Sequence, residues 1–442
     1  MSASRGEFSS RVGFVLAAAG SAVGLGNIWR FPYVAGADGG GAFLVLYLVI
    51  VFTIGIAIML AELAIGRASK RNPVGAFRNL KGGAWVGVGY IGVAAGFVIL
   101  SFYSVVGGWT LAYIVATLGP LLDASDAAAV GRHFQTFTAD PVQTILYHAL
   151  FMALTIGIVM GGIEKGIERA GKLLMPILFV MLAALVIRAV TLPGAAAGIR
   201  FFLEPDWSKV SATTVNAALS QAFFSLSLGM GALLTYGSYL SKRESLIGVS
   251  LWVTALDTLV AMMAGLLILP AVFAFGYDPA GGPGLTFVTL PAIFAKMPGG
   301  HLFAPVFFIL LALAALTSAV SLLEAVVAYF VDEKNHHRKR ASVITGIAIF
   351  ALGVPSALSL GPWADVKLFG KDFLGLMDYL TTNLLLPFGG IALAVFAGWV
   401  CASRMREEVG EGGRRQRIAT IWLFVVKWVA PAAVLWILIS GL

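Results

Sequence analysis

Two apolar stretches of the chain carry glycine and polar residues at their centres, where an ordinary membrane helix has none. The first is residues 18–33, AAGSAVGLGNIWRFPY, with Gly20, Gly24 and Gly26 in its middle. A helix broken here would expose backbone carbonyls at one end of the break and N–H groups at the other. Such groups bind a cation and an anion inside membrane proteins. The alternative interpretation is a glycine-rich face on which neighbouring helices pack closely.

The second interrupted stretch and two further polar features lie later in the chain. Residues 220–231, SQAFFSLSLGMG, again place serine and glycine at the centre of an apolar run. Asp257 is a carboxylate within such a run, which is costly unless it is paired or coordinates an ion. Thr317 and Ser318 are adjacent hydroxyls that suit a hard cation, although membrane hydroxyls often bond back to their own helix.

The composition predicts an all-α polytopic membrane protein. The chain has 442 residues, of which 59% are hydrophobic and 12% charged, and its mean hydropathy is +0.91. Soluble domains carry about twice that share of charge. The net charge of +8 lies in loops between apolar spans, which indicates membrane topology and argues against a nucleic-acid partner. The single cysteine, Cys401, excludes an intrachain disulfide.

Hydropathy at about 20 residues per span predicts about eleven transmembrane helices. Nineteen of the thirty basic residues lie in the loops 67–84, 163–172, 241–244, 332–340 and 402–418. The positive-inside rule therefore places these loops and the amino terminus in the cytoplasm. The outer loops 192–213 and 276–301 are predicted to fold as short helices. The predicted spans are 11–36, 41–66, 87–119, 143–162, 167–191, 214–240, 245–275, 302–331, 341–359, 374–401 and 419–440.

The two interrupted stretches fall in the first and sixth of these spans. Interruptions at corresponding positions of two halves are typical of transporters with inverted repeats and a site at the membrane midplane. We therefore interpret residues 1–442 as one transporter domain. Within it, 11–191 forms the first five-helix repeat, 214–401 the second, and 419–440 an additional helix.

The interrupted stretches also carry a family resemblance. Residues 20–33, the GGGAF motif at 39–43, residues 223–231 and the Leu316-Thr317-Ser318 triplet resemble the neurotransmitter:sodium symporter family. The bacterial leucine transporter is a member of that family. The similarity covers the first ten predicted helices and implies a sodium-coupled amino-acid transporter with broken helices 1 and 6.

The resemblance implies two sodium sites, both bound mainly by oxygen. The first would use the Ala22 and Ser225 carbonyls, the side chains of Asn27, Ser225 and Asp257, and the substrate carboxylate. The second would use the Gly20, Val23 and Ala314 carbonyls with the Thr317 and Ser318 hydroxyls. Sodium is a hard cation, and broken-helix carbonyls bind it without burying many full charges.

The resemblance also implies a substrate site between helices 1, 3, 6 and 8. The N–H groups of Leu25 and Gly26, with the Tyr103 hydroxyl, would bind a carboxylate. Oxygens of Ala22, Phe224, Ser225 and Ser227 would bind an amine. The side-chain pocket would be formed by Ile99, Phe224, Met230, Ser318 and Leu322, for which plain core packing is the alternative. Ser21 stands beside this site, where the leucine transporter has asparagine.

Two positions narrow the expected substrate. Gly24 replaces the aspartate that pairs the amine in the family's monoamine carriers, so a carboxylate-free amine is not expected. Met230 replaces a bulky phenylalanine of the leucine transporter, and a flexible thioether adapts to differing shapes. We therefore expect hydrophobic or aromatic L-amino acids. Because Asp257 supplies a fixed negative charge and Ala261 lacks a hydroxyl, transport is expected to be independent of chloride, perhaps with proton counter-transport through Asp257.

The resemblance further implies two ion-pair gates, Arg30 with Asp378 on the outer side and Arg5 with Asp332 on the inner side. Phe224 would lie below the outer gate. Phe8 and a polar network of Ser238, Tyr239 and Glu324 would lie near the inner one. Gly166 and Pro176 resemble a spacing that accompanies unwinding of helix 5, although a static kink would give the same pattern.

Sodium-coupled symport into the cell is the leading functional interpretation. A proton-coupled carrier of the same architecture and a substrate-gated channel are the alternatives, and the intact Thr317-Ser318 pair favours sodium over protons. An enzyme is not expected, because no nucleophile elbow or metal-ligand spacing is present. Eleven helices with short termini resemble bacterial members, which implies the bacterial inner membrane. The sequence assigns no oligomeric state.

Overall fold

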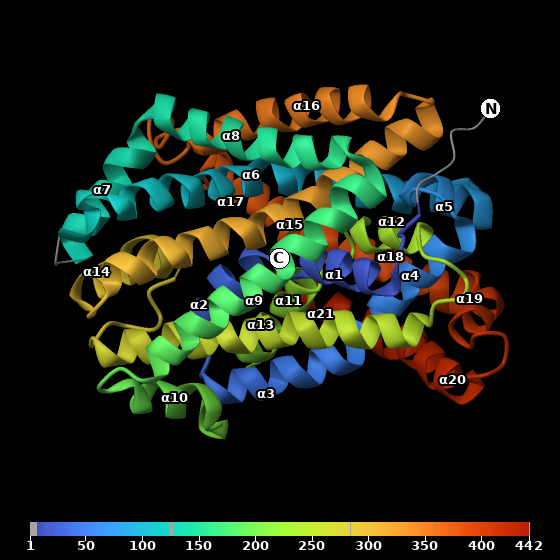
Figure 1. Ribbon diagram of the computed structural model, residues 1–442. Helices are drawn as coiled ribbons and strands as arrows, with labels where there is room; N and C mark the ends of the chain where they lie inside the picture. The colour runs from blue at the N-terminus through green and yellow to red at the C-terminus, as the bar shows by residue number, and fades with distance from the viewer. Residues whose placement is uncertain (1–6, 124–126, 283, 442) are drawn as a thin grey trace.

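The computed structural model describes residues 7–123, 127–282 and 284–441, and the architecture is helical (Figure 1). In these residues, nine helices are long and apolar enough to cross a membrane, and one bent pair makes a tenth. The helices that build the nine are α3 (Gly41–Ile50), α4 (Ile56–Ser69), α6 (Val86–Leu118), α8 (Pro141–Met160), α9 (Arg169–Val190), α13 (Leu246–Ala274), α15 (Gly300–Lys334), α16 (Arg338–Leu358), α17 (Phe373–Tyr379), α18 (Leu386–Val395), α20 (Gln416–Phe424) and α21 (Ala430–Gly441).

The bent pair is the predicted first span. α1 (Arg11–Ala22) ends where Val23 takes an extended conformation, with φ −68° and ψ 111°. After two residues the chain continues as a π-helical turn, η1 (Gly26–Arg30), and then as α2 (Phe31–Ala37), at 49° to α1. The predicted break in this span is confirmed.

The sixth predicted span is also interrupted. α11 (Ala212–Ser225) and α12 (Ala232–Ser238) are separated by six residues, of which Ser227, Gly229 and Gly231 have positive φ. A non-glycine residue in the left-handed region costs about 1 kcal/mol or more, so other contacts must hold this turn. One of them comes from Glu62 of α4, whose Oε1 accepts the Gly229 N–H at 2.6 Å. The count of eleven spans, with α11 and α12 as one of them, remains a prediction. The grouping into two repeats remains a prediction.

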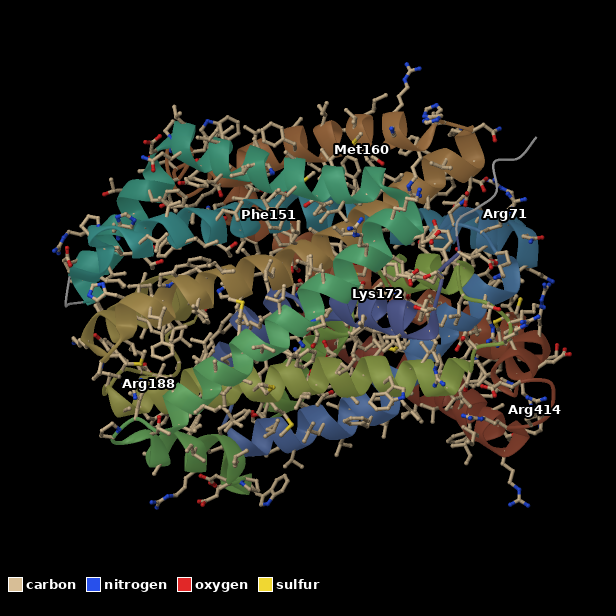
Figure 2. The ribbon with its side chains drawn as sticks, viewed as in Figure 1. Arg71, Phe151, Met160, Lys172, Arg188 and Arg414 are labelled. Carbon is tan, nitrogen blue, oxygen red and sulfur yellow. The ribbon has the colours of Figure 1, made fainter. Side chains whose placement is uncertain are left out.

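The two ends of the helix bundle differ. The short helices α5 (Pro73–Leu80) and α19 (Ala402–Val409) lie at one end together with the start of α20, whereas α7 (Ala127–Ala139), α10 (Ala195–Leu203) and α14 (Leu290–Lys296) lie at the other (Figure 1). Figure 2 shows Arg71 and Arg414 at the first end and Arg188 towards the second. The predicted short helices in 192–213 and 276–301 are present as α10 and α14. α7 was not predicted, because its alanines and polar residues keep its mean hydropathy below that of a membrane span.

The inner end of helix 5 is π-helical rather than unwound. The turn η5 (Ile163–Glu168) contains Gly166 and continues into α9, which runs through Pro176 without a break. A side chain at Gly166 would collide with the Ile158 carbonyl of α8. The glycine therefore permits close packing of two helices here.

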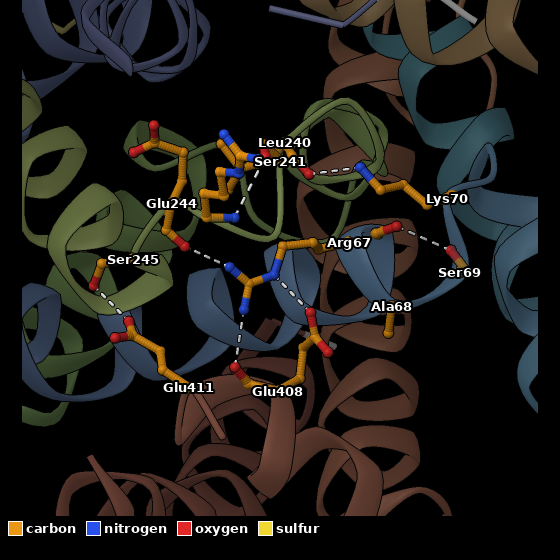
Figure 3. Close-up of polar contacts among 12 residues, drawn as sticks. Arg67, Ala68, Ser69, Lys70, Leu240, Ser241, Glu244, Ser245, Glu408 and Glu411 are labelled. Carbon is orange, nitrogen blue, oxygen red and sulfur yellow. Dashed lines mark hydrogen bonds and ion pairs between the residues drawn. The ribbon is translucent and has the colours of Figure 1, made fainter. Parts of the chain in front are cut away.

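A buried arginine ties three segments together at the end that carries α5 and α19. Arg67 of α4 is 3% exposed and donates from Nε to Glu408 Oε1 of α19 at 2.6 Å (Figure 3). Its two other nitrogens donate to the Glu244 and Glu408 carbonyls at 2.6 and 2.9 Å. Lys70 adds a bond to the Leu240 carbonyl at 2.7 Å. The loop after α12 is thereby fixed to α4 and α19.

Replacing Arg67 by alanine is expected to lower the free energy of unfolding by about 3–5 kcal/mol, because it leaves a carboxylate and two carbonyls without their donor. Thermal or denaturant unfolding of the purified protein in detergent measures this. Arg78→Ala is the matched control. Arg78 pairs with Glu333, but its side chain is 51% exposed, so a loss of about 0–1 kcal/mol is expected. Equal losses of unfolding free energy in the two variants would contradict the stabilising role of Arg67.

Candidate functional site

A small cavity of about 20 Å³ lies where the breaks of the first and sixth spans face α6 and α15. Its walls are backbone and small side chains on one side and larger apolar side chains on the other. It is lined by Ala22, Gly24, Gly26, Ile99, Tyr103, Phe224, Ser227, Met230, Ser318 and Leu322. Nine of the twelve predicted substrate residues thus surround one cavity, and Gly24 joins them. Ser21, Leu25 and Ser225 do not line it with their side chains.

The break in the first span presents its N–H groups to Tyr103. The Leu25 N–H donates to the Tyr103 hydroxyl at 3.0 Å, and both residues are buried. A Cβ at Gly24 would collide with the Ser318 hydroxyl and would lie 2.6 Å from the Tyr103 hydroxyl. Position 24 therefore has no room for a side chain. Leu25 contributes to the site through its backbone.

Ser21 also acts through its backbone. Its hydroxyl donates to Ser321 Oγ of α15 at 2.7 Å, away from the cavity. Its carbonyl accepts bonds from Ser227 Oγ at 2.9 Å and from Ser318 Oγ at 3.1 Å. The polar atom that Ser21 offers near the cavity is thus a carbonyl oxygen already shared by two hydroxyls.

The side chains predicted for the first sodium site form one buried cluster. Asn27 Nδ2 donates to Ser225 Oγ at 2.9 Å and to Asp257 Oδ1 at 2.7 Å. Ser225 Oγ donates to Asp257 Oδ2 at 2.9 Å. All three are fully buried, and no basic side chain of the described residues pairs with Asp257. A buried carboxylate without a cation is costly. These oxygens therefore fit a small hard cation.

Two members of this cluster were missed from the sequence. Tyr47 of α3 donates its hydroxyl to Ser225 Oγ at 3.2 Å. Gln221 of α11 donates from Nε2 to the Gly26 carbonyl at 2.7 Å, and its Oε1 has no partner among the described residues. Gln221 is a polar residue in an interrupted span and could have been selected. Tyr47 gives no such signal in an ordinary apolar run.

The predicted second sodium site brings hydroxyls of α15 to the carbonyl end of α1. Ser318 Oγ lies 3.0 Å from the Val23 carbonyl, 3.1 Å from that of Ser21 and 3.3 Å from that of Gly20. Thr317 Oγ1 lies 3.0 Å from the Ala314 carbonyl and 3.5 Å from that of Val23. One hydroxyl hydrogen cannot satisfy three carbonyls. The surplus of acceptors fits a cation.

The predicted outer gate is not closed by an ion pair. The Arg30 guanidinium lies over the Phe224 ring, 4.9 Å from its centroid. Asp378 accepts a bond from the Thr382 hydroxyl at 3.3 Å. Among the described residues, no ion pair within 4.0 Å joins Arg30 and Asp378. The cation–π contact takes the place of the pair in this structure, and its Phe224 ring also lines the cavity.

The inner end shows part of the predicted network. Arg5 lies outside the described residues, and Asp332 Oδ2 accepts two bonds from Asn72, each of 3.1 Å. Tyr239 donates its hydroxyl to Glu324 Oε1 at 2.7 Å, and Glu324 also pairs with Arg338. Arg338 was missed.

Ser238 does not belong to this network, because its hydroxyl donates to the Thr235 carbonyl of its own helix at 2.6 Å. The expectation for Ser238 was therefore wrong. The Phe8 ring packs edge-on against the rings of Phe14 and Tyr236, with centroids 5.1 and 5.7 Å apart.

Two broken spans that meet at a cavity in a helical membrane protein are typical of transporters with a central binding site. The model of the sodium:neurotransmitter symporter family matches residues 5–128 and 138–442. The chain belongs to this family, as the sequence resemblance implied. It is a sodium-dependent membrane transporter and not an enzyme.

Relatives support the same assignment along the whole chain. The sodium-dependent transporter YhdH of Bacillus subtilis (strain 168) is 40% identical over 97% of this chain and 96% of its own. A sodium-dependent transporter of Haemophilus influenzae is 38% identical over 99% and 98%. The crystal structure of MhsT in complex with L-phenylalanine is similar with a TM-score of 0.92 and 46% identity. The match covers 99% of this chain and 100% of that one.

Proposed function

We propose that the protein couples sodium entry to the uptake of hydrophobic or aromatic L-amino acids by alternating access. The observation that carries this proposal is the cavity at the two breaks, where the Leu25 N–H and the Tyr103 hydroxyl meet and apolar side chains contribute to the lining. An amino acid has complementary chemistry. Its carboxylate suits the N–H end of a broken helix, and its side chain suits an apolar wall. The structural relative MhsT binds L-phenylalanine.

The polar part of the substrate is assigned to the first and sixth spans. The carboxylate would accept from the Leu25 and Gly26 N–H groups and from the Tyr103 hydroxyl. The ammonium group would donate to carbonyls near Ala22 and Phe224 and to the Ser227 hydroxyl. Because a Cβ at position 24 has no space, no protein carboxylate there can pair the amine. A substrate must therefore bring its own carboxylate.

The apolar part of the cavity sets the side-chain preference. Ile99, Met230 and Leu322 are each at most 4% exposed and line the cavity opposite the polar groups. Methionine has three rotatable side-chain bonds and repacks around different shapes. We therefore propose that aromatic and branched aliphatic side chains are both accepted.

Met230→Phe is expected to narrow this range. The rigid ring would occupy space that an indole needs, and overpacking of this kind costs about 1–3 kcal/mol. Tryptophan should then compete for uptake at least about tenfold more weakly, and leucine should change little. Competition against labelled leucine measures both. Met262→Phe, at a half-buried position outside the cavity, is the control. An unchanged tryptophan affinity in M230F would contradict the assigned position of the side chain.

We propose two sodium sites with the residues given above, the first touching the substrate carboxylate and the second joining α1 to α15. Ser318→Ala is expected to weaken sodium activation of uptake roughly ten- to a hundredfold, because losing a bond to a charged partner costs about 1.5–3 kcal/mol. Ser250→Ala removes a buried hydroxyl that bonds only its own helix, and it should leave sodium activation unchanged. A normal sodium dependence in S318A would remove Ser318 from the site.

The function is tested by uptake of labelled tryptophan and leucine into proteoliposomes. Concentrative uptake with an inward sodium gradient, and none with potassium in its place, is the expected result. Uptake driven by a proton gradient without sodium would instead establish a proton-coupled carrier. Single-channel currents without accumulation would establish a channel. We further propose a bacterial inner-membrane location, as in the bacterial members that the chain resembles. The basic loops support an amino terminus in the cytoplasm.

A further inference from the structure

A lysine lies within the last membrane-spanning helix, on its outer surface. Lys427 belongs to the π-helical turn η10 (Val425–Val429) between α20 and α21. It is half-buried, and no carboxylate of the described residues lies within ion-pair distance. A charged side chain within a membrane span is expensive and normally marks a partner or a function. The charge of Lys427 therefore lacks a compensating group within the described protein.

Lys427 has defined contacts with the preceding membrane span. Its Nζ lies 4.5 Å from the centroid of Trp399, which belongs to η9 (Phe396–Val400) of the preceding span. The Trp399 indole N–H in turn donates to the Lys427 carbonyl at 3.1 Å. A Cβ at Gly398 would lie 3.1 Å from Lys427 Cα, so the two helices touch here. Both turns are π-helical, a geometry that is frequent at functional sites.

The site opens to the membrane and not to the cavity of the transporter. Trp399 and Trp428 are 47% and 54% exposed, and their rings meet edge-on at 4.6 Å. Phe424, one turn earlier, is 60% exposed. Exposed aromatic side chains of membrane helices gather at the level of the lipid headgroups. A cation held over the ring of Trp399, which itself contacts Trp428, therefore faces headgroups.

The depth of Lys427 in the membrane agrees with an ammonium group near the lipid headgroups. The last span is predicted to begin near residue 419, so Lys427 lies about 12 Å inside it at 1.5 Å per residue. A lysine at that depth extends its ammonium group towards the interface. Arg404 and Arg417 lie beyond that end of the two spans, in the segment rich in basic residues. The bilayer leaflet on this side thus meets a net positive surface.

We propose that Lys427, Trp399 and Trp428 form a binding site for the headgroup of one anionic phospholipid, with its acyl chains along the exposed apolar faces of α20 and η10. The phosphate would pair with the Lys427 ammonium, and the two indoles would flank the headgroup. Occupancy would fix the last helix against the preceding span. The lipid would belong to the cytoplasmic leaflet. This one part of the proposal rests on the topology in the proposed function, which places the amino terminus in the cytoplasm.

Native mass spectrometry of the purified transporter, titrated with phosphatidylglycerol or phosphatidylcholine, tests this site. One phosphatidylglycerol should be retained preferentially, and Lys427→Gln should weaken it about fivefold or more, the usual effect of one basic residue at a membrane surface. Lys427→Arg should restore retention. Lys242→Gln, which removes one exposed positive charge from a basic loop, is the matched control. Thermal unfolding without lipid checks that each variant is folded.

Each other outcome overturns the site. Equal retention of the lipid by K427Q and the unsubstituted protein would exclude Lys427 as its partner, and equal loss in K242Q would show a diffuse surface effect. Displacement of the lipid by glycerol phosphate would assign the site to a free phosphate ester. A dimer that dissociates in K427Q would assign this face to a second copy of the chain. None of these results bears on sodium-driven uptake, which is measured separately.

Discussion

Uptake is expected to fall at least about a hundredfold when Asp257 is replaced by asparagine. The substitution keeps the size of the side chain and its acceptor oxygen, but it removes the carboxylate charge from the Asn27–Ser225 cluster. Removing one charge of a buried ion pair costs about 3–5 kcal/mol, which corresponds to a factor of about a hundred or more in affinity. Sodium activation of uptake in proteoliposomes measures the loss.

Asp278→Asn is the control, because Asp278 lies in an exposed loop. The same assay should show no difference between chloride and gluconate for the unsubstituted protein, since Asp257 already provides the negative charge. Strong stimulation of that protein by chloride would contradict this assignment. Sodium activation that survives unchanged in D257N would place the ion elsewhere.

Gly24→Ala is expected to abolish most substrate binding and leave the protein folded. The added methyl group would meet the Ser318 and Tyr103 hydroxyls at the point where the cavity touches the second cation cluster. Both would have to move, at a cost of about 1–3 kcal/mol, and the Leu25–Tyr103 bond would be distorted. Scintillation proximity binding of labelled amino acid should show affinity reduced at least about tenfold.

Gly157→Ala provides the comparison. Gly157 lies in α8, and a Cβ there meets nothing within 4 Å. Alanine is about 1 kcal/mol more favourable than glycine within a helix, so this variant should be as stable as the original or more so. If G24A binds substrate normally, the cavity is not where the amino acid lies.

Much of the fold could be predicted because each span is a long apolar run and each break contains its own signal. Gly24 and Gly26 in the first span, and Gly229 and Gly231 in the sixth, mark the two interruptions. The boundaries of most spans agree within a few residues with the predicted ranges. α7 escaped prediction because it lies outside the membrane spans, where hydropathy carries little information. The π-helical turns were also not predictable, since they depend on packing between helices.

The candidate site was also predictable only in part. Residues near the breaks, such as Asn27 and Ser225, were selected because they match positions of the family motif that the sequence resembles. Tyr47 and Glu62 act on the same breaks from a neighbouring span, and only the tertiary structure shows this. The direction of the Ser21 hydroxyl, towards Ser321, could not be predicted from the sequence either. Sequence identifies the polar residues, and the structure determines which atom of each one is used.

The single hydroxyl of Ser318 that faces three carbonyls of the first span has a consequence for turnover. Without an ion, this hydroxyl can donate to one of the three carbonyls at a time, and the Ser227 and Thr317 hydroxyls are the other donors beside them. Departure of the ion would therefore loosen α1 from its neighbour, so the slow return of the empty carrier would depend on how readily sodium leaves. High internal sodium would then favour exchange of bound amino acid across the membrane over net accumulation.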